Sequence, residues 1–514
     1  MLHALGTHHS ELSLQITKSP FLMPPNILII MTDQHSKHFL GCAGNDLVRT
    51  PNLDRLAFQG TRFTNAYCGA PVCVPSRMSF MTSRTPSRNR VWGNNHILSS
   101  GIPTWAHALG ASGYETALIG RMHFVGSDQR HGFERRPIGE YSATHPGAPK
   151  QGGSQWTMFP VSTSGQSRVS VEIAGKGTTS YQWFDEQVTA TACDYLVAHG
   201  GGSDRPFAAA VGYVLPHCPF VAPADLFDYY YDRVSIPDVE TDQPPTVQRF
   251  RSHRNILDPP LPEERIRIAL AAYYALCEYS DQSIGQVLNA VNENGLADNT
   301  LVIYASDHGE MAGAHGCWWK SCYYEGSAGV PLIMRHPGVI PENGTSDAIC
   351  NLMDLGPTVI DVAGAEPLPN IDGRSMKPLL DGRQNDNWVH ETFSELVDFQ
   401  GGGGDPLPSR MIRSGKWKYW EYSDPENLPP ALFDLSADPD EINDLGQDHA
   451  YTGLRTELST RLREHWDPEF ALREALDGKA SHDMIAAWGK AVQPACKDTL
   501  PAPDPPVETD VRLL

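Results

Sequence analysis

Side chains of the types that perform catalysis follow four apolar runs of this sequence. They are Asp33, Gln34 and His35 after PNILIIM, Arg121 and His123 after TALIG, His217 after FAAAVGYVL, and Asp307 and His308 after NTLVIYAS. Open α/β sheets bind ligands at the carboxyl ends of their strands, so runs that each deliver polar groups there predict one convergent site. At any single position, the alternative is an aspartate that only caps the next helix.

Four of these side chains carry the donor atoms of a metal site. Asp33 and Asp307 offer carboxylate oxygens, which are hard ligands. Gln34 adds a carbonyl oxygen and His308 adds an imidazole nitrogen. Closely packed carboxylates repel and raise each other's pKa, and a cation relieves that repulsion. We therefore expect these four side chains to hold one divalent metal ion.

The stretch CVPSR at residues 73–77 adds a thiol to the candidate chemistry. Pro75 is tolerated in the first turn of a helix and RMSFMTS continues a helical pattern, so Cys73 is predicted at or just before a helix N-terminus. The positive end of the helix dipole there favours an anionic nucleophile or an anionic substrate. For a cysteine taken alone, a buried structural thiol is the ordinary interpretation.

The elements that position these residues are those of an α/β protein. Short runs rich in β-branched residues alternate with longer helical patterns such as IRIALAAYYALCEYSDQSIGQVLNAV. A chain of 514 residues is long enough for more than one domain. The formal net charge of −21 argues against nucleic acid or an anionic membrane as partner, because such contacts need basic patches.

Several features of the sequence bear on its compartment. No run approaches the roughly 20 apolar residues of a membrane-spanning helix. The first 26 residues show no basic segment followed by a continuous apolar one, so we do not expect a secretory signal. The 10 cysteines are scattered without a C-x-x-C pair, and we expect most of them to be reduced. These observations favour a cytoplasmic protein.

In order and spacing, the motifs resemble those of type I sulfatases of the alkaline phosphatase superfamily. CVPSR is similar to the C-x-P-S-R signature by which that family converts cysteine to Cα-formylglycine. Further matches are PNILIIMTDQ at 25–34, TPNLDRLAFQGTRFTNAYCGAPVCVPSR at 50–77, TALIGRMHF at 116–124, LPHCPF at 215–220, SDHGEMAGAHGCWWKSCYYEGSAGVPLI at 306–333, IDGRSMKPLLDG at 371–382 and ALFDLSADPDEINDL at 431–445.

The resemblance implies a covalent mechanism at Cys73. The aldehyde made from Cys73 hydrates to a geminal diol, and one hydroxyl, activated by the metal, attacks the sulfur of a sulfate ester. The alcohol leaves, and the second hydroxyl then collapses to the aldehyde and expels sulfate. The implied roles are metal ligation by Asp33, Gln34, Asp307 and His308, positioning of the diol by Arg77, assistance to the nucleophile by His123, contact with the ester and its leaving oxygen by His217 and Lys320, and contact with a sulfuryl oxygen by Asn94.

Each of the last three roles has a plainer alternative. Lys320 is alternatively a solvated surface charge, His217 a buried core histidine and Asn94 a turn residue.

Many sulfatases carry Asp-Asp and Asp-Asn where this chain has Asp33-Gln34 and Asp307-His308. These pairs resemble the branch of choline sulfatases, phosphonate monoester hydrolases and dimeric arylsulfatases. An imidazole ligand shifts preference toward manganese without excluding calcium, so we expect one Ca²⁺ or Mn²⁺.

Arg121 is the second departure, because the family usually has lysine there. A guanidinium is planar and does not deprotonate, so it does not copy an ammonium, and the role of Arg121 stays open. We favour an aryl or otherwise hydrophobic sulfate ester as substrate. The alternatives are choline sulfate, a phosphonate monoester or phosphodiester, and a silent metal- or anion-binding protein. An aromatic cage for choline would need several placed rings, and the unplaced candidates are Trp92, Trp156, Trp318 and Trp319.

The resemblance also implies the domain organisation. We expect an α/β fold, an alkaline-phosphatase-like sandwich with a large, mostly parallel mixed sheet between helices, followed by a small α+β subdomain with an antiparallel sheet. The predicted ranges are an N-terminal extension at 1–23, a catalytic domain at 24–385 with an insertion near 140–180, the subdomain at 386–475 and an extended tail at 476–514. We expect a formylglycine-generating maturation enzyme as partner and a homodimer or homotetramer.

Overall fold

The main sheet has eight strands, with β1 (Asn26–Asp33) near its centre. The structure is a computed structural model, which describes residues 24–140, 144–147, 166–202, 204–240, 243–383, 385–399 and 406–494. The strand order is β10-β2-β9-β8-β1-β6-β3-β4, and neighbouring strands are parallel except where β9 pairs with β8 and β2. The other strands are β2 (Thr61–Tyr67), β3 (Glu115–Gly120), β4 (Arg135–Ile138), β6 (Phe207–Pro216), β8 (Thr300–Ser306), β9 (Leu332–Arg335) and β10 (Gly344–Asn351).

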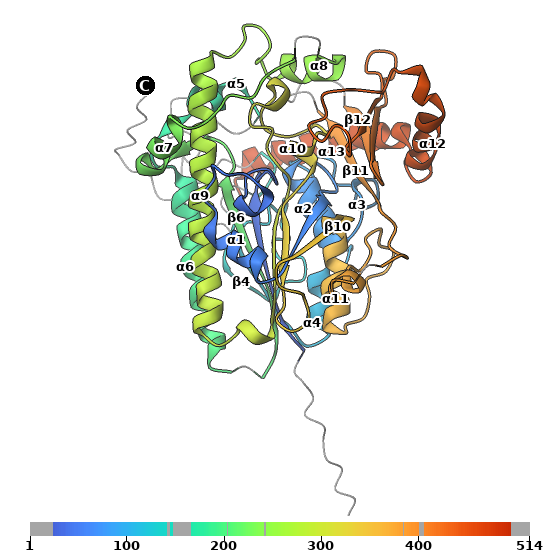
Figure 1. The fold of residues 1–514 in the computed structure, drawn as a ribbon. Helices are drawn as coiled ribbons and strands as arrows, with labels where there is room; N and C mark the ends of the chain where they lie inside the picture. The colour runs from blue at the N-terminus through green and yellow to red at the C-terminus, as the bar shows by residue number, and fades with distance from the viewer. Residues whose placement is uncertain are drawn as a thin grey trace, which may run out of the picture.

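Helices cover both faces of this sheet (Figure 1). Side chains alternate along β1, so Ile27 and Ile29 enter one core cluster while Leu28 and Ile30 enter the other. The cluster around Leu28 contains residues of α6 and α9, and the cluster around Ile27 contains residues of α2, α4 and α11. These helices are α2 (Cys73–Thr82), α4 (Trp105–Ala111), α6 (Ser180–Gly200), α9 (Glu263–Glu293) and α11 (Leu355–Ala363). The result is the three-layer α/β arrangement expected from the sequence.

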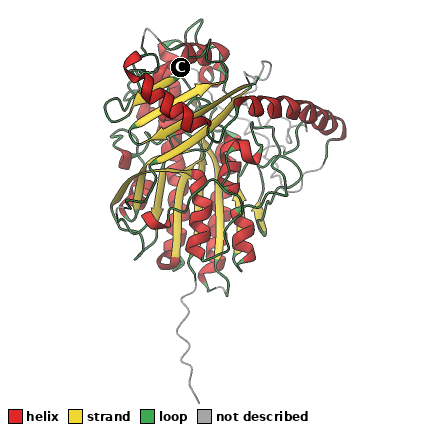
Figure 2. Cartoon of the chain, turned by 90° about the vertical axis from the view of Figure 1, so that its right-hand side faces the viewer, coloured by secondary structure: helices red, strands yellow, loops and turns green. Residues whose placement is uncertain are grey.

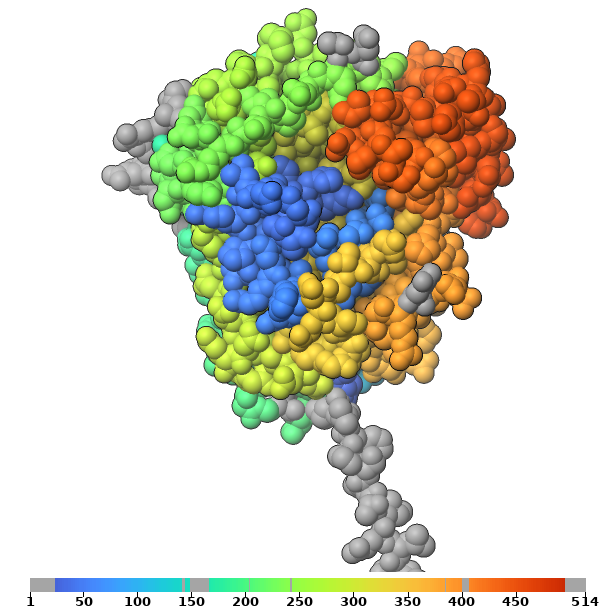
Figure 3. Space-filling view, in the orientation of Figure 1, coloured from blue at the N-terminus to red at the C-terminus, as the bar shows by residue number. Residues whose placement is uncertain are grey.

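A second, antiparallel sheet follows in the chain and packs beside the main one (Figures 2 and 3). The run SRMIRSGKWKYWEY is a hairpin, because Gly415 takes a positive φ of 54° and turns the chain between two strands. Helix α12 packs on this sheet through Leu458 and Leu462. The elements are β11 (Glu391–Asp398), β12 (Leu407–Ser414), β13 (Trp417–Tyr422), β14 (Ala431–Asp434) and α12 (Thr452–Arg463). The expected fold class is therefore confirmed.

Helix α13 (Pro468–Val492) corrects one prediction. We expected an extended tail from residue 476, but residues 476–492 are helical. The Asp467 side chain caps the first turn by accepting from Glu469 N, and Pro468 fits the first helical position. The prolines that suggested an extended tail lie further on, from residue 494. The Pro-rich segment itself, residues 1–23 and most of the predicted insertion lie outside the described residues.

The remaining elements are short and connect the layers. Among the described residues, no helix combines the length and the apolar character that crossing a membrane requires. The short elements are α1 (Pro51–Phe58), α3 (Pro86–Asn89), α5 (Arg168–Glu172), α7 (Ala224–Tyr231), α8 (Pro245–His253), α10 (Glu325–Ala328), β5 (Gly175–Lys176) and β7 (Val221–Ala222).

Candidate active site

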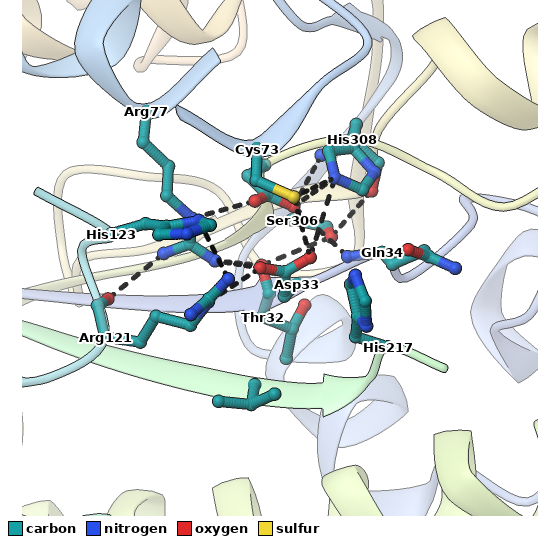
Figure 4. Close-up of polar contacts among 12 residues, drawn as sticks. Thr32, Asp33, Gln34, Cys73, Arg77, Arg121, His123, His217, Ser306 and His308 are labelled. Atoms are coloured by element: carbon teal, nitrogen blue, oxygen red, sulfur yellow. Dashed lines mark hydrogen bonds and ion pairs between the residues drawn. The ribbon is translucent and has the colours of Figure 1, made fainter. Parts of the chain in front are cut away.

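The carboxyl ends of β1 and β8 bring two aspartates together. The strands pair in parallel with Thr32 opposite Ser306, so Asp33 and Asp307 are the next residues at the same edge of the sheet. Both side chains are fully buried. His308 follows Asp307 directly, and its Nε2 atom lies 3.5 Å from an oxygen of each aspartate. The convergence expected from the strand ends is thus present for these three residues, and Figure 4 shows Asp33 and His308 side by side.

Cys73 begins helix α2 and meets the same cluster. Its Sγ atom lies 3.6 Å from Asp33 Oδ1 and 3.2 Å from His308 Nε2. The helix start is also held by Asn94, whose Oδ1 atom accepts a hydrogen bond from Val74 N at 3.0 Å. The sequence-based placement of Cys73 at a helix N-terminus is confirmed. Asn94 therefore contacts the helix that carries Cys73.

The donor atoms of this cluster fit a divalent cation. One ligand atom from each of Asp33, Cys73, Asp307 and His308 lies within 4.8 Å of all the others. His308 Nδ1 is 3.0 Å from the Gly309 carbonyl oxygen, so the proton belongs on Nδ1 and Nε2 is an acceptor. Burial lowers the pKa of His308, which favours the neutral, ligating imidazole. Two carboxylates and an imidazole are ligands for Mn²⁺ or Ca²⁺.

Two buried guanidinium groups balance the aspartates. Arg77 Nε donates to Asp307 Oδ2 at 2.8 Å and Arg77 Nη2 to Asp33 Oδ2 at 3.3 Å, while Arg121 Nε donates to Asp33 Oδ2 at 2.9 Å. Burial alone would raise the pKa of Asp33, but Arg121 and the other nearby cations outweigh it and hold that pKa well below its usual value. Each carboxylate thus uses Oδ2 for arginine and turns Oδ1 toward His308.

Glu140 organises the neighbouring Arg121 and His123. Its Oε1 accepts from Arg121 Nη1 at 3.0 Å and its Oε2 from the His123 backbone N at 2.8 Å. Arg121 Nη2 lies 2.8 Å from His123 Nδ1, and a guanidinium can only donate hydrogen bonds, so His123 Nδ1 accepts and Nε2 bears the ring proton. Burial and then Arg121 lower the pKa of His123. Sequence reasoning missed Glu140, which stands outside every matched motif.

Gln34 and Lys320 form a separate link at the edge of the cluster. Lys320 Nζ donates to Gln34 Oε1 at 2.5 Å, and Gln34 Nε2 donates to Glu310 Oε2 at 2.5 Å. Glu310 Oε1 accepts the backbone N–H groups of Ala312 and Trp319, which fixes the carboxylate. The Gln34 carbonyl oxygen is therefore bound to Lys320, and its role as a metal ligand stays a prediction. Glu310 was also missed, although it lies within the motif SDHGEM.

A cavity of about 610 Å³ lies next to these groups. His217 and Lys320 line it, although both are largely buried. Its other walls come from distant parts of the chain, including the C-terminal helix α13. Lining residues used below are Trp92, Asn94, Gln166, Arg254, Ser321, Asp398, Phe399, Lys479 and Asp483. The cavity offers space for a ligand beside the buried cluster.

Fold and site together define an α/β hydrolytic enzyme, and comparisons with known proteins specify its family. The family model described as Sulfatase matches residues 25–365, and one described as N-sulphoglucosamine sulphohydrolase, C-terminal, matches residues 313–467. The chain is similar to a choline-sulfatase of Rhizobium meliloti (strain 1021), with 34% identity over 90% of each chain. It is also similar to arylsulfatase K of Xenopus laevis, with 28% identity over 84% of this chain and 80% of that one. The chain belongs to the sulfatase family and is a sulfuric ester hydrolase.

Solved structures agree with the fold. A phosphonate monoester hydrolase of Agrobacterium radiobacter superposes with a TM-score of 0.69 at 23% identity, covering 89% of this chain and 96% of that one. A putative sulfatase from Bacteroides thetaiotaomicron gives a TM-score of 0.67 at 23% identity, covering 89% and 94%. The resemblance to type I sulfatases inferred from the motifs is confirmed.

Proposed function

We propose that the chain hydrolyses sulfate monoesters of aryl or other hydrophobic alcohols, with Cys73 converted to formylglycine. The observation that carries this proposal is the position of Cys73 Sγ, 3.2 Å from His308 Nε2 and 3.6 Å from Asp33 Oδ1. A structural thiol would be surrounded by apolar side chains, whereas this one faces the polar cluster. The motif CVPSR supplies the sequence context for its modification.

The reaction follows from the position of the diol on residue 73. A divalent cation bound by Asp33, Asp307 and His308 would lower the pKa of a hydroxyl and polarise a sulfuryl oxygen. One diol oxygen bonds to sulfur while the S–O bond to the alcohol breaks and the alcohol oxygen takes a proton. The second hydroxyl then loses its proton, the C=O bond re-forms and the C–O bond to sulfate breaks. The aldehyde is restored, and no water molecule has to attack sulfur.

We assign a protein group to each step of this reaction. Arg77, held by both aspartates, lies beside residue 73 and stabilises the developing negative charge. His123 presents Nε2–H and orients the diol or a sulfuryl oxygen. His217 and Lys320 line the cavity and donate to the leaving oxygen. The Lys320 ammonium is held at the edge of the cluster by its hydrogen bond to Gln34 Oε1.

The cavity walls support a hydrophobic alcohol. Trp92 and Phe399 line it, and both present aromatic rings. Trp318 and Trp319 belong instead to the core cluster between the sheet and α9, so they do not supply rings of an aromatic cage. Trp156 lies outside the described residues. The ring set of the described cavity therefore suits a flat aryl group better than a quaternary ammonium, which several rings must surround.

Choline sulfate is the second candidate substrate, because the similar protein of Rhizobium meliloti is a choline-sulfatase. Phosphonate esters are the third, since a diol and a metal suit either tetrahedral anion. Values of kcat/KM for phenyl sulfate, choline sulfate and phenyl phenylphosphonate distinguish these three candidate substrate classes. The proposal requires phenyl sulfate to be the best of the three, and a preference for either other ester would replace it.

The maturation step is tested by mass spectrometry. Protein co-expressed with a formylglycine-generating enzyme should yield a tryptic Cys73 peptide about 18 Da lighter than the cysteine form, as thiol-to-aldehyde conversion requires. An unmodified thiol with intact metal binding would support a silent binding protein. We also propose that the metal is Ca²⁺ or Mn²⁺, which elemental analysis tests. We further propose a cytoplasmic homodimer or homotetramer; cell fractionation tests the location and native mass measurement tests the oligomeric state.

A further inference from the structure

Arg254 is a buried cation on the cavity wall. It directly follows helix α8 and its side chain is 7% exposed. Nε and Nη2 each donate to Gln166 Oε1 at 3.2 Å, and Nη1 donates to the Phe250 carbonyl oxygen at 3.4 Å. The guanidinium carbon also lies 3.8 Å from the centre of the Phe250 ring. All of these partners are neutral.

Three other charged residues of the cavity wall, Lys479, Asp483 and Asp398, take part in direct ion pairs, whereas Lys320 donates to the neutral Gln34 Oε1. Lys479 Nζ lies 2.9 Å from Asp483 Oδ2, and Asp398 Oδ2 lies 3.1 Å from Arg249 Nη1. Among the described residues, Arg254 has no carboxylate within ion-pair distance. A buried charge without a direct ion pair is costly, and burial accordingly lowers the pKa of Arg254, although Asp398 attracts the guanidinium at longer range and partly opposes that shift. An anion entering the cavity would relieve that cost.

Gln166 connects Arg254 to the reaction centre. Its Oε1 accepts from Arg254, while its Nε2 donates to Ser321 Oγ at 2.8 Å. Ser321 follows Lys320, whose ammonium is bound to Gln34. Arg254, Gln166, Ser321 and Lys320 all line the same cavity, so they form one continuous polar wall. A ligand whose sulfate lies near Lys320 can extend along this wall toward Arg254.

We infer that Arg254 determines specificity by binding a second anionic group, a carboxylate or a sulfate, on the alcohol part of the substrate. The inference rests on the proposed function and narrows it to sulfate esters whose alcohol is itself anionic. A guanidinium fork matches both oxyanions with paired hydrogen bonds, and Phe250 holds its plane. A quaternary ammonium alcohol would meet the same cation and be repelled.

Binding of non-hydrolysable sulfonates tests the inference without relying on turnover. Benzenesulfonate is compared with 3-sulfobenzoate, 4-sulfobenzoate and benzene-1,3-disulfonate by isothermal titration calorimetry with the metal-loaded full chain. At least one dianion should bind wild-type protein about tenfold or more tightly than benzenesulfonate, since hydrogen bonds to charged groups are that strong. Arg254→Gln should abolish this preference and leave the Kd of benzenesulfonate unchanged.

Arg251→Gln is the matched control, because Arg251 lies in helix α8 just before Arg254 and donates to Gln243 rather than lining this cavity. It should keep the preference for dianions. Arg254→Lys, which keeps the charge without the fork, should retain only part of it and replaces Arg254→Gln if that variant does not fold. Equal Kd values for all sulfonates in wild type, or an unchanged preference in a folded Arg254 variant, would overturn the inference.

Phenyl sulfate turnover, measured alongside, tests the proposed function separately. If turnover is absent while the preference for dianions is intact, the result contradicts the proposed hydrolysis and supports the anion site.

Discussion

Two buried clusters of this molecule contain the same charges in different arrangements. The reaction-centre cluster consists of Asp33, Arg77, Arg121 and Asp307, and the interface cluster consists of Lys37, Glu325, Lys418 and Glu441. In the interface cluster, Lys418 Nζ lies 2.8 Å from an oxygen of each glutamate. The acceptors there converge on an ammonium group. In the reaction-centre cluster, the Oδ1 atoms converge on each other, on His308 and on Cys73.

The different direction of the carboxylate oxygens indicates a structural role for the interface cluster and a chemical role for the reaction-centre cluster. The interface cluster joins β13 of the small sheet to α10 of the main domain, and its two carboxylates pair with its two ammonium groups. The reaction-centre cluster leaves one oxygen of each aspartate directed at other ligand atoms, an arrangement that a divalent cation stabilises. Counting buried charges would not distinguish the two clusters, whereas the direction of the second carboxylate oxygen does.

The largest effect on activity is expected from a substitution in the reaction-centre cluster. Cys73→Ala removes the nucleophile, so kcat/KM for phenyl sulfate should fall by roughly 10⁴-fold or more, as for other nucleophile deletions. The thermal midpoint should change little, because the thiol is small. Cys277→Ala is the control, since Cys277 is equally buried but lies in α9 within the apolar core. Comparable activity loss in both variants would contradict the assignment.

Lys418→Met should affect stability and spare catalysis. It leaves Glu325 and Glu441 buried without their shared cation, which typically costs about 3–5 kcal/mol in the free energy of unfolding. Urea unfolding measures this cost. The kcat of the folded variant should match wild type, because the interface cluster contacts no reacting atom. A large fall in kcat with unchanged stability would reverse the distinction drawn between the clusters.

Asp307→Asn tests the metal site within the reaction-centre cluster. It removes one of the two carboxylates whose Oδ1 atoms converge, so bound manganese or calcium should drop and kcat/KM should fall at least about 100-fold. Elemental analysis and steady-state kinetics measure the two effects. Asp354→Asn is the control, because the buried Asp354 carboxylate accepts hydrogen bonds from the backbone N–H groups of Asn351 and Arg374 and lies outside the cluster. Full metal content in Asp307→Asn would exclude Asp307 as a ligand.

Arg121→Lys restores the residue that the resemblance leads one to expect. Lysine keeps the charge beside Asp33 but cannot also reach Glu140 and His123 with a planar fork. The predicted result is a fall in kcat of about tenfold with a smaller change in KM, corresponding to one charged hydrogen bond. An increase in kcat would show instead that Arg121 is a weaker substitute for lysine.

Asp185 provides the smallest and most specific test. Its oxygens accept from Val214 N and Leu215 N, both at 2.9 Å, and burial raises its pKa to about 7. A carboxyl group with a raised folded-state pKa stabilises fully below its unfolded value near 4. That contribution is lost as pH rises toward 7. The unfolding free energy of wild type should therefore decline more steeply between pH 4 and pH 7 than that of Asp185→Asn, and parallel curves would refute the shift.

The strand-end logic predicted the centre of this site well. Asp33, Asp307 and His308 follow β1 and β8, and parallel pairing of those strands makes their convergence a consequence of sequence position. Cys73 was equally predictable from its place before a helix. Glu140 was not, because an isolated glutamate after a four-residue strand shows no pattern. Its importance arises from packing against Arg121, which only the folded chain reveals.

The C-terminal region shows a different limit. The prolines near the C-terminus led us to predict an extended conformation from residue 476 onward. The helix of residues 468–492 was missed for that reason. Arg254 likewise had no sequence signal, because its significance lies in the lack of a direct ion pair among the residues that the structure describes. Helix α13 and Arg254 line the same cavity as His217 although they are far apart in the chain. Local sequence patterns do not predict which distant segments of the chain form a cavity wall together.

The burial of Cys73 has a consequence for the order of events during synthesis. Its side chain is 1% exposed once folded, so the maturation enzyme of the proposed conversion would have to reach the thiol while the chain is still open. Its contact partner His308 is 235 residues further along. At translation rates of roughly 5–20 residues per second, the ribosome takes on the order of 10–50 seconds to make that distance. The sheet cannot close over Cys73 before β8 exists, so the distance between the two residues sets a time window for maturation.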